Sequence, residues 1–103
     1  MKSTTMEEKV DGLLNRYPGK VPIIINDQNN IFHKTKFLIP ESYTVGMFMA
    51  VLRNYTEIKK HQALFMFFDG ILPSSNSTIG ELYLKYRKEN MLECTVTLEN
   101  TFG

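Results

Sequence analysis

Apolar and polar residues follow two kinds of pattern along this chain. Apolar residues recur at helical spacing in three segments, 6–17, 45–55 and 79–86. Short apolar or alternating runs, which are typical of strands, occupy four others, 21–26, 33–40, 63–68 and 91–98. The pattern therefore predicts the order helix, strand, strand, helix, strand, helix, strand.

Local signals mark where these elements begin and end. Thr5, Thr44 and Thr78 stand before the apolar positions of the three helices, as N-cap residues do, because a hydroxyl oxygen can accept a hydrogen bond from the first turn. The polar run 27–30 predicts a turn between the first two strands, and the Asp-Gly pair at 69–70 predicts a tight turn after the third. The first two strands are therefore predicted to form a hairpin.

Alternation within the strands predicts which side chains share a face. In the run 33–40, Lys34, Lys36 and Leu38 fall on one face, and the residues between them fall on the other. The run 63–68 is apolar throughout, so we expect this strand to be buried on both faces.

The predicted elements indicate one domain of the α+β class. A hairpin, a crossover helix and two further strands around one main helix describe the β-grasp, or ubiquitin-like, arrangement. We expect a four-stranded mixed sheet packed on the main helix, with one short N-terminal helix before the sheet. This gives an N-terminal helical extension over 1–17, a ubiquitin-like domain over 18–98 and a flexible C-terminal tail over 99–103.

Composition is that of an ordinary globular protein. A chain of 103 residues, 43% of them hydrophobic, can build a core without disulfides or metals. Twelve Lys+Arg and eleven Asp+Glu leave a net charge of +1, which gives no general attraction to nucleic acid or to an anionic membrane. We expect a cytoplasmic protein, because one cysteine cannot form an internal disulfide and no apolar run has the length of a signal peptide or a membrane span. We also expect a monomer.

Residues that carry enzyme chemistry are sparse. Cys94 lies inside a predicted strand, where a packed and inert thiol is the expected state. His33 and His61 stand alone near lysines, and no Cys/His spacing suits zinc. The runs "STIG" and "PSSNS" have too few glycines for a phosphate-binding loop. We therefore expect no enzymatic activity, metal or cofactor.

Four blocks of the sequence closely resemble one known family. They are "RYPGKVPIII" (16–25), "KFLIPESYTVGMF" (36–48), "ALFMFFDGILP" (63–73) and "ENTFG" (99–103). These blocks resemble the autophagy-related protein 8 family, which has the ubiquitin-like fold and includes relatives of GABA-receptor-associated protein and microtubule-associated protein light chain three. The resemblance covers nearly everything after Leu13, in the family's own order.

The resemblance implies a conjugated modifier. In that family a protease trims the precursor to a terminal glycine, which activating and conjugating enzymes carry as a thioester and transfer to phosphatidylethanolamine. The matching residue here is Gly103, and Phe102 matches the aromatic position that the protease reads. Glycine suits this chemistry because it has no Cβ to obstruct attack on its carbonyl. The implied localisation is cytoplasmic, with a lipidated pool on autophagosome membranes.

The resemblance also implies docking of aromatic-x-x-aliphatic motifs from cargo receptors and autophagy factors, which add a strand to the edge of the second strand. The aromatic pocket would be lined by Leu13, Pro22, Ile24, Lys36, Leu38 and Met91. The aliphatic pocket would be surrounded by Phe37, Ile39, Pro40, Tyr43, Phe48, Val51 and Leu52. Acidic residues flanking the motif would meet Lys34, Lys36 and Arg53.

Alternatives remain at the level of residues and of function. Periodicity alone favours Phe48, Val51 and Leu52 as plain core residues, and the resemblance makes core packing and pocket lining about equally good explanations. Met91 stands where the family usually has phenylalanine, and the segment before Tyr17 is shorter than the family's two N-terminal helices. The chain could instead be a modifier attached to a protein lysine, like autophagy-related protein 12, or an unconjugated β-grasp binding module.

Overall fold

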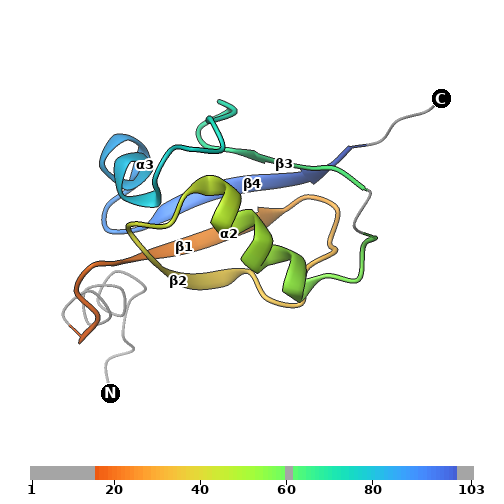
Figure 1. Ribbon diagram of the computed structural model, residues 1–103, viewed down its shortest axis with the longest axis horizontal. Coiled ribbons are helices and arrows are strands. Elements are labelled where there is room, and N and C mark those ends of the chain that lie inside the picture. Colours follow the sequence, from red (N-terminus) through yellow and green to blue (C-terminus); the bar gives the residue numbers. More distant parts are fainter. Residues whose placement is uncertain (1–15, 60–61, 100–103) are drawn as a thin grey trace, which may run out of the picture.

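The computed structural model describes residues 16–59 and 62–99, which form a four-stranded sheet with two α-helices (Figure 1). In chain order the elements are β1 (Lys20–Asp27), β2 (Lys36–Pro40), α2 (Val45–Leu52), the 3₁₀ helix η1 (Arg53–Tyr55), β3 (Leu64–Phe67), α3 (Ile79–Tyr86) and β4 (Leu92–Leu98). Most of the predicted helix 6–17, and its predicted N-cap Thr5, lie outside the described residues.

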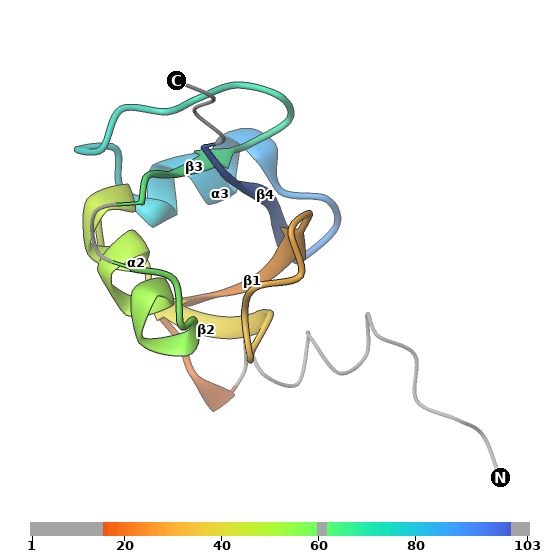
Figure 2. The same cartoon turned by 90° about the vertical axis from the view of Figure 1, so that its right-hand side faces the viewer.

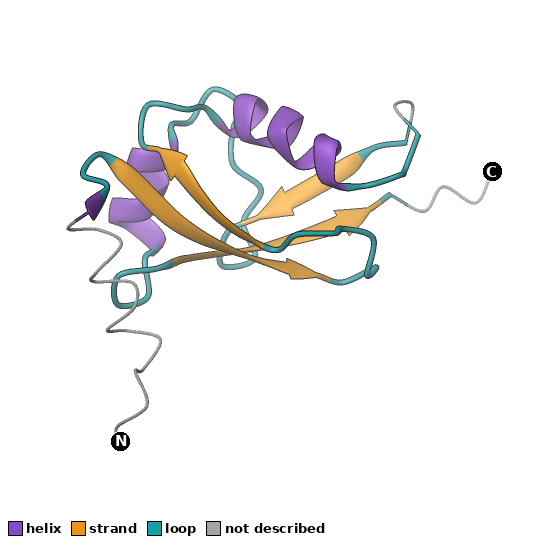
Figure 3. Ribbon diagram, turned by 90° about the horizontal axis from the view of Figure 1, so that it is seen from below, coloured by secondary structure: helices purple, strands orange, loops and turns teal. Residues whose placement is uncertain are grey.

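The parallel pair of β1 and β4 forms the centre of the sheet, whose strand order is β2-β1-β4-β3. β2 runs antiparallel to β1 at one edge, and β3 runs antiparallel to β4 at the other. α2 lies across one face of the sheet, and α3 lies near the end where β4 begins (Figures 1 and 3). The β-grasp arrangement predicted from the sequence is confirmed.

The hydrophobic core lies between α2 and the face of the sheet that α2 covers, here called the inner face. Figure 2 shows α2 facing the strands across this core. Two side chains of α2, Phe48 and Leu52, have no exposed surface. The strands contribute buried alternate residues, which are Val21, Ile23, Ile25, Phe37, Ile39, Leu64, Met66, Leu92, Cys94 and Val96.

Both α-helices begin with the same pattern of a threonine, a β-branched residue and a glycine. The hydroxyl oxygens of Thr44 and Thr78 each accept a hydrogen bond from the amide three residues on, at 3.1 and 3.2 Å. The two caps form an isolated antiparallel bridge, in which the Ile79 N–H donates to the Tyr43 carbonyl at 2.7 Å. Amides at the start of α2 donate in turn to the loop before α3. Each helix start therefore satisfies backbone groups of the other.

The two predicted turns are both present. Asp27 builds the turn between β1 and β2, because its carboxylate oxygens accept hydrogen bonds from the Ile31 and Phe32 amides at 3.1 and 2.8 Å. After β3, Asp69 and Gly70 both have positive φ, 52° and 78°, as a tight turn with two left-handed central residues requires.

The expectation that the run 63–68 is buried on both faces is wrong. β3 is an edge strand, and only its inner-facing residues, Leu64 and Met66, are fully buried. Phe65 and Phe67 point to the opposite face, here called the outer face, where they are half-buried with their ring centroids 6.4 Å apart. An apolar residue at every position thus reflects two apolar faces, of which α2 covers one.

Several predicted boundaries shift by one to three residues. β2 begins at Lys36 instead of 33, because the His33 N–H donates to the Tyr55 carbonyl at 2.7 Å instead of entering the ladder. α2 ends at Leu52, so Tyr55, which was predicted in the same helix, belongs to η1. β4 begins at Leu92, and Met91 forms an isolated bridge before it. None of the helices in the described part of the chain has the length and apolar character needed to cross a membrane.

Candidate functional site

The outer face of β1 and β2 brings together most of the residues predicted to line an aromatic pocket. Pro22 lies directly opposite Leu38, and Ile24 lies directly opposite Lys36. Leu38 and Ile24 are half-buried, Pro22 is buried and Lys36 is exposed. The predicted alternation is therefore confirmed over Lys36–Pro40, and it places Leu38 beside the charged Lys36 on the face away from α2, whereas Lys34 precedes the strand.

The remaining residues of that predicted pocket are Met91, just before β4, and Leu13 in the N-terminal segment. Met91 is half-buried and directly precedes Leu92, which pairs with Ile23. The parallel register thus places Met91 level with Pro22, one strand away from the β1–β2 pair. Leu13 lies outside the described residues.

The residues predicted to surround an aliphatic pocket divide into core and surface. Phe37, Ile39, Phe48 and Leu52 are core residues, each at most 7% exposed. The Phe37 ring packs edge-to-face on Phe48 and Tyr55, with centroids 5.6 and 5.3 Å apart. Pro40, Tyr43 and Val51 are half-buried and keep some surface. Phe48 and Leu52 are thus core residues, as periodicity alone allowed, and Val51 is the member of that trio that reaches solvent.

The basic residues beside this surface have different surroundings. Lys34 places its ammonium nitrogen 5.1 Å from the Phe37 ring centroid and 5.4 Å from that of Tyr55, at cation–π distance. Arg53 donates a hydrogen bond from Nη2 to the Gln62 carbonyl at 2.9 Å. The Arg53 guanidinium is therefore already engaged by the backbone, whereas Lys36 is exposed on the outer face.

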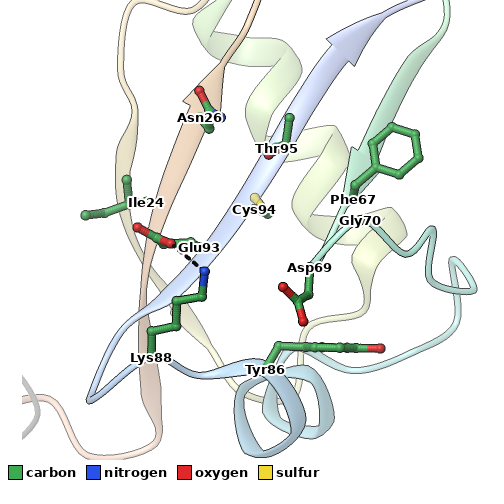
Figure 4. A pocket seen from close by; sticks show the side chains of 10 residues that line it. All are labelled: Ile24, Asn26, Phe67, Asp69, Gly70, Tyr86, Lys88, Glu93, Cys94 and Thr95. Carbon is green, nitrogen blue, oxygen red and sulfur yellow. Dashed lines mark ion pairs between the residues drawn. The ribbon is translucent and has the colours of Figure 1, made fainter.

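Three pockets in the described part of the chain lie mostly away from these residues. Figure 4 shows one on the outer face, with a volume of about 380 Å³, bounded by Ile24, Tyr86 and an ion pair of 3.4 Å between Lys88 Nζ and Glu93 Oε2. Ile24 is its one lining residue from the predicted docking set. Two further pockets, of about 550 and 260 Å³, contain no residue of that set. The described residues of the predicted docking surface lie along a strand edge, where Ile24 and Leu38 are half-buried apolar side chains.

The buried thiol of Cys94 has the character predicted for it. The side chain faces the core and is 2% exposed. Burial raises the pKa of the Cys94 thiol far above its ordinary value, because the interior disfavours a thiolate charge. Since the thiolate is the nucleophile, this cysteine stays protonated and inert.

At the end of β4, two backbone amides donate hydrogen bonds to acceptors on Asn29 and Ala63, for which the sequence predicted no such contact. The Leu98 N–H donates to the side-chain oxygen of Asn29 at 2.8 Å, and the Glu99 N–H donates to the Ala63 carbonyl at 2.9 Å. Asn29 was predicted only as part of a turn, and no local pattern indicates a partner 69 residues away. Phe102 and Gly103, the predicted recognition and conjugation residues, lie outside the described residues.

Comparison with known proteins gives one consistent family. The family described as "Autophagy protein Atg8 ubiquitin like" matches residues 5–103. Autophagy-related protein 8 of Schizosaccharomyces pombe is 34% identical over 93 residues, which are 85% of this chain and 77% of the relative. The crystal structure of Trypanosoma brucei ATG8 superposes with a TM-score of 0.84 at 28% identity, covering 94% of this chain and 88% of that one.

A more distant structure shares the fold. Plasmodium falciparum Atg8, solved in complex with a Plasmodium falciparum Atg3 peptide, superposes with a TM-score of 0.75 at 22% identity. The match covers 88% of this chain and 85% of that one.

Proposed function

This chain belongs to the Atg8 family, a family of ubiquitin-like modifiers in autophagy, and we propose that it is conjugated through Gly103 to phosphatidylethanolamine. The observation that carries the proposal is the family match, which extends through residue 103 and includes the block "ENTFG". Phe102 is the residue that the processing protease reads, and Gly103 is the residue whose carboxylate is activated.

The role of the chain in this chemistry is that of a substrate. ATP-dependent activation converts the Gly103 carboxylate into a thioester on an enzyme cysteine, and the lipid amine then displaces the thiol to form an amide. The described part of the chain supports this role, because its cysteine is buried and protonated and therefore unsuited to nucleophilic catalysis. The Plasmodium relative solved with an Atg3 peptide supports a conjugating enzyme as a partner.

Covalent attachment explains how a nearly neutral protein could be held on a membrane. The net charge of +1 provides no strong attraction to an anionic surface. A diacyl lipid adds about 0.8 kcal/mol for each CH₂ group that it buries, and two chains anchor stably where one is marginal. We therefore propose a cytoplasmic pool and a lipidated pool on autophagosome membranes.

We further propose that the edge of β2 docks aromatic-x-x-aliphatic peptides of cargo receptors. An added strand would bond to the edge of β2 that no other described strand covers, and its aromatic anchor would contact Leu38 and Pro22 on the outer face. An aromatic side chain buries roughly 150–250 Å², enough to dominate a small interface. The exposed Lys36 would attract acidic residues beside the motif.

The experiment that tests the conjugation proposal is lipidation with purified activating and conjugating enzymes, ATP and vesicles containing phosphatidylethanolamine. The wild-type chain is expected to give a product cleaved by phospholipase D, and Gly103→Ala is expected to give less than about 1% of it, because the added methyl group hinders the carbonyl. Thr101→Ala is the matched control in the same tail and is expected to react normally.

Two outcomes would contradict the proposal. A wild-type chain that stays unmodified, while a known family member is lipidated in the same mixture, would leave an unconjugated binding module as the better description. A product that resists phospholipase D and has the mass of a protein adduct would indicate a modifier attached to a lysine.

A further inference from the structure

Hydrogen bonds hold the end of β4 on both sides, and on the β1 side the acceptor is the side chain of Asn29. The backbone ladder between β1 and β4 stops at Val96, opposite Asp27. Two residues further on, the Leu98 N–H donates to Asn29 Oδ1 at 2.8 Å. Asn29 therefore adds one hydrogen bond to the sheet beyond the last backbone pair.

The turn that carries Asn29 is itself held in place. The Asp27 carboxylate accepts hydrogen bonds from the Ile31 and Phe32 amides, and the Asp27 carbonyl accepts one from Asn30 at 3.2 Å. These bonds fix the backbone on both sides of Asn29. The side-chain amide of Asn29 is thus presented by an ordered turn, which lowers the entropic cost of its bond to Leu98.

The β3 side is held by backbone groups. The Glu99 N–H donates to the Ala63 carbonyl at 2.9 Å. The carbonyl of the preceding residue, Gln62, accepts the Arg53 Nη2 hydrogen bond, so the start of β3 is tied to η1. The segment that leads to Gly103 therefore leaves the sheet from a position defined by bonds on both edges of β4.

We propose that Asn29 is a positioning residue for conjugation, which fixes the point where residues 99–103 leave the domain. This inference rests on the proposed conjugation through Gly103. Without the Asn29 bond, the end of β4 is held only on the β3 side, by the pairing of Leu98 with Leu64 and by the Glu99–Ala63 hydrogen bond, so residues 98 and 99 separate from the sheet more often. Each time they separate, two more extended residues add at most about 7 Å to the reach of the tail. A longer tether spreads its end over a larger volume and lowers the effective concentration of the glycine at an enzyme bound to the domain.

The first test measures the bond itself, by amide hydrogen exchange of the unconjugated full chain. In Asn29→Ala the Leu98 amide is expected to exchange roughly 3–10-fold faster, since one net hydrogen bond is lost. Asn29→Asp keeps an acceptor oxygen and is expected to restore slow exchange. The matched control is Gln28→Ala, an exposed position in the same turn, which is expected to leave Leu98 unchanged. Equal Leu98 exchange in Asn29→Ala and Gln28→Ala would overturn the inference.

The second test measures conjugation kinetics with the same variants. Asn29→Ala is expected to lower kcat/KM for lipidation about 2–5-fold through an increased KM, and Asn29→Asp is expected to recover it. Fast Leu98 exchange with unchanged kcat/KM would overturn the positioning role. If Gly103→Ala were still conjugated, the proposed function would fail instead, and the exchange result for Leu98 would stand unaffected.

Discussion

The two edges of the sheet expose apolar side chains in different chemical settings. At the β2 edge, Leu38 lies on the same face as the exposed, charged Lys36. At the β3 edge, Phe65 and Phe67 are half-buried in a strand without a charged residue. Edge strands can add a further strand, and lysine limits unselective pairing. The β2 edge is thus suited to a peptide with acidic flanks, whereas the β3 edge provides no preference for charge within the strand.

The largest expected effect is a difference in stability between an inner-facing residue of β2 and an outer-facing residue of β3. Phe37→Ala removes a β2 side chain that packs on Phe48 and Tyr55, and it is expected to lower the free energy of unfolding by about 3–5 kcal/mol. Phe67→Ala, on the half-buried outer face of β3, is expected to cost about 1 kcal/mol. Urea unfolding followed by circular dichroism measures both. Equal losses would contradict the assignment of Phe37 to the core.

The next effect distinguishes the edges as docking sites. Leu38→Asp is expected to raise the Kd of an aromatic-x-x-leucine peptide with acidic flanks at least about 30-fold. The new carboxylate would be buried beneath the aromatic anchor of the peptide and would repel the acidic flanks. Phe67→Asp is the matched change at the other edge and is expected to change Kd less than about 2-fold. Fluorescence polarisation with a labelled peptide measures Kd. The reverse pattern would assign docking to β3.

A smaller effect tests the charge difference between the edges. Lys36→Glu is expected to weaken the same peptide about 5–10-fold at low ionic strength, and the difference is expected to shrink as salt is added, because exposed charges are screened. Lys85→Glu, at an exposed position of α3, is the control for net charge. A salt-independent loss would indicate that Lys36 acts through packing.

The smallest expected effect concerns Arg53. Its guanidinium already donates to the Gln62 carbonyl, so Arg53→Ala is expected to change peptide Kd less than about 2-fold. The same substitution is expected to lower the free energy of unfolding by about 1 kcal/mol, because the Gln62 carbonyl loses a charge-assisted partner. A loss of affinity like that of Lys36→Glu would show that Arg53 leaves Gln62 to contact the peptide.

Much of the fold could be predicted because its signals are local. Thr44 and Thr78 are helix caps as predicted, and the alternation around Leu38 assigns faces correctly. The error over the run 63–68 has a physical cause. A strand with two apolar faces has the same pattern whether it is central or at an edge, so position in the sheet is decided by pairing partners.

The candidate site could be predicted only where the relevant contacts are local. The face shared by Lys36 and Leu38 follows from the two-residue period of a strand. The engagement of Arg53 by a backbone carbonyl and of Asn29 by Leu98 depends on where loops meet in space. A basic residue or a turn asparagine has the same appearance in the sequence whether or not such a partner exists.

The central pairing of β1 with β4 has a consequence for how the protein is made. Because β4 lies between β1 and β3, the β1–β2 hairpin and β3 cannot join into one sheet until β4 has left the ribosome. Chains grow at roughly 5–20 residues per second, so the missing strand and residues 99–103 emerge within about a second or two of each other. A chain interrupted before β4 would lack both a complete sheet and the proposed conjugation residue, Gly103. Gly103 is thus synthesised only after all four strands of the sheet.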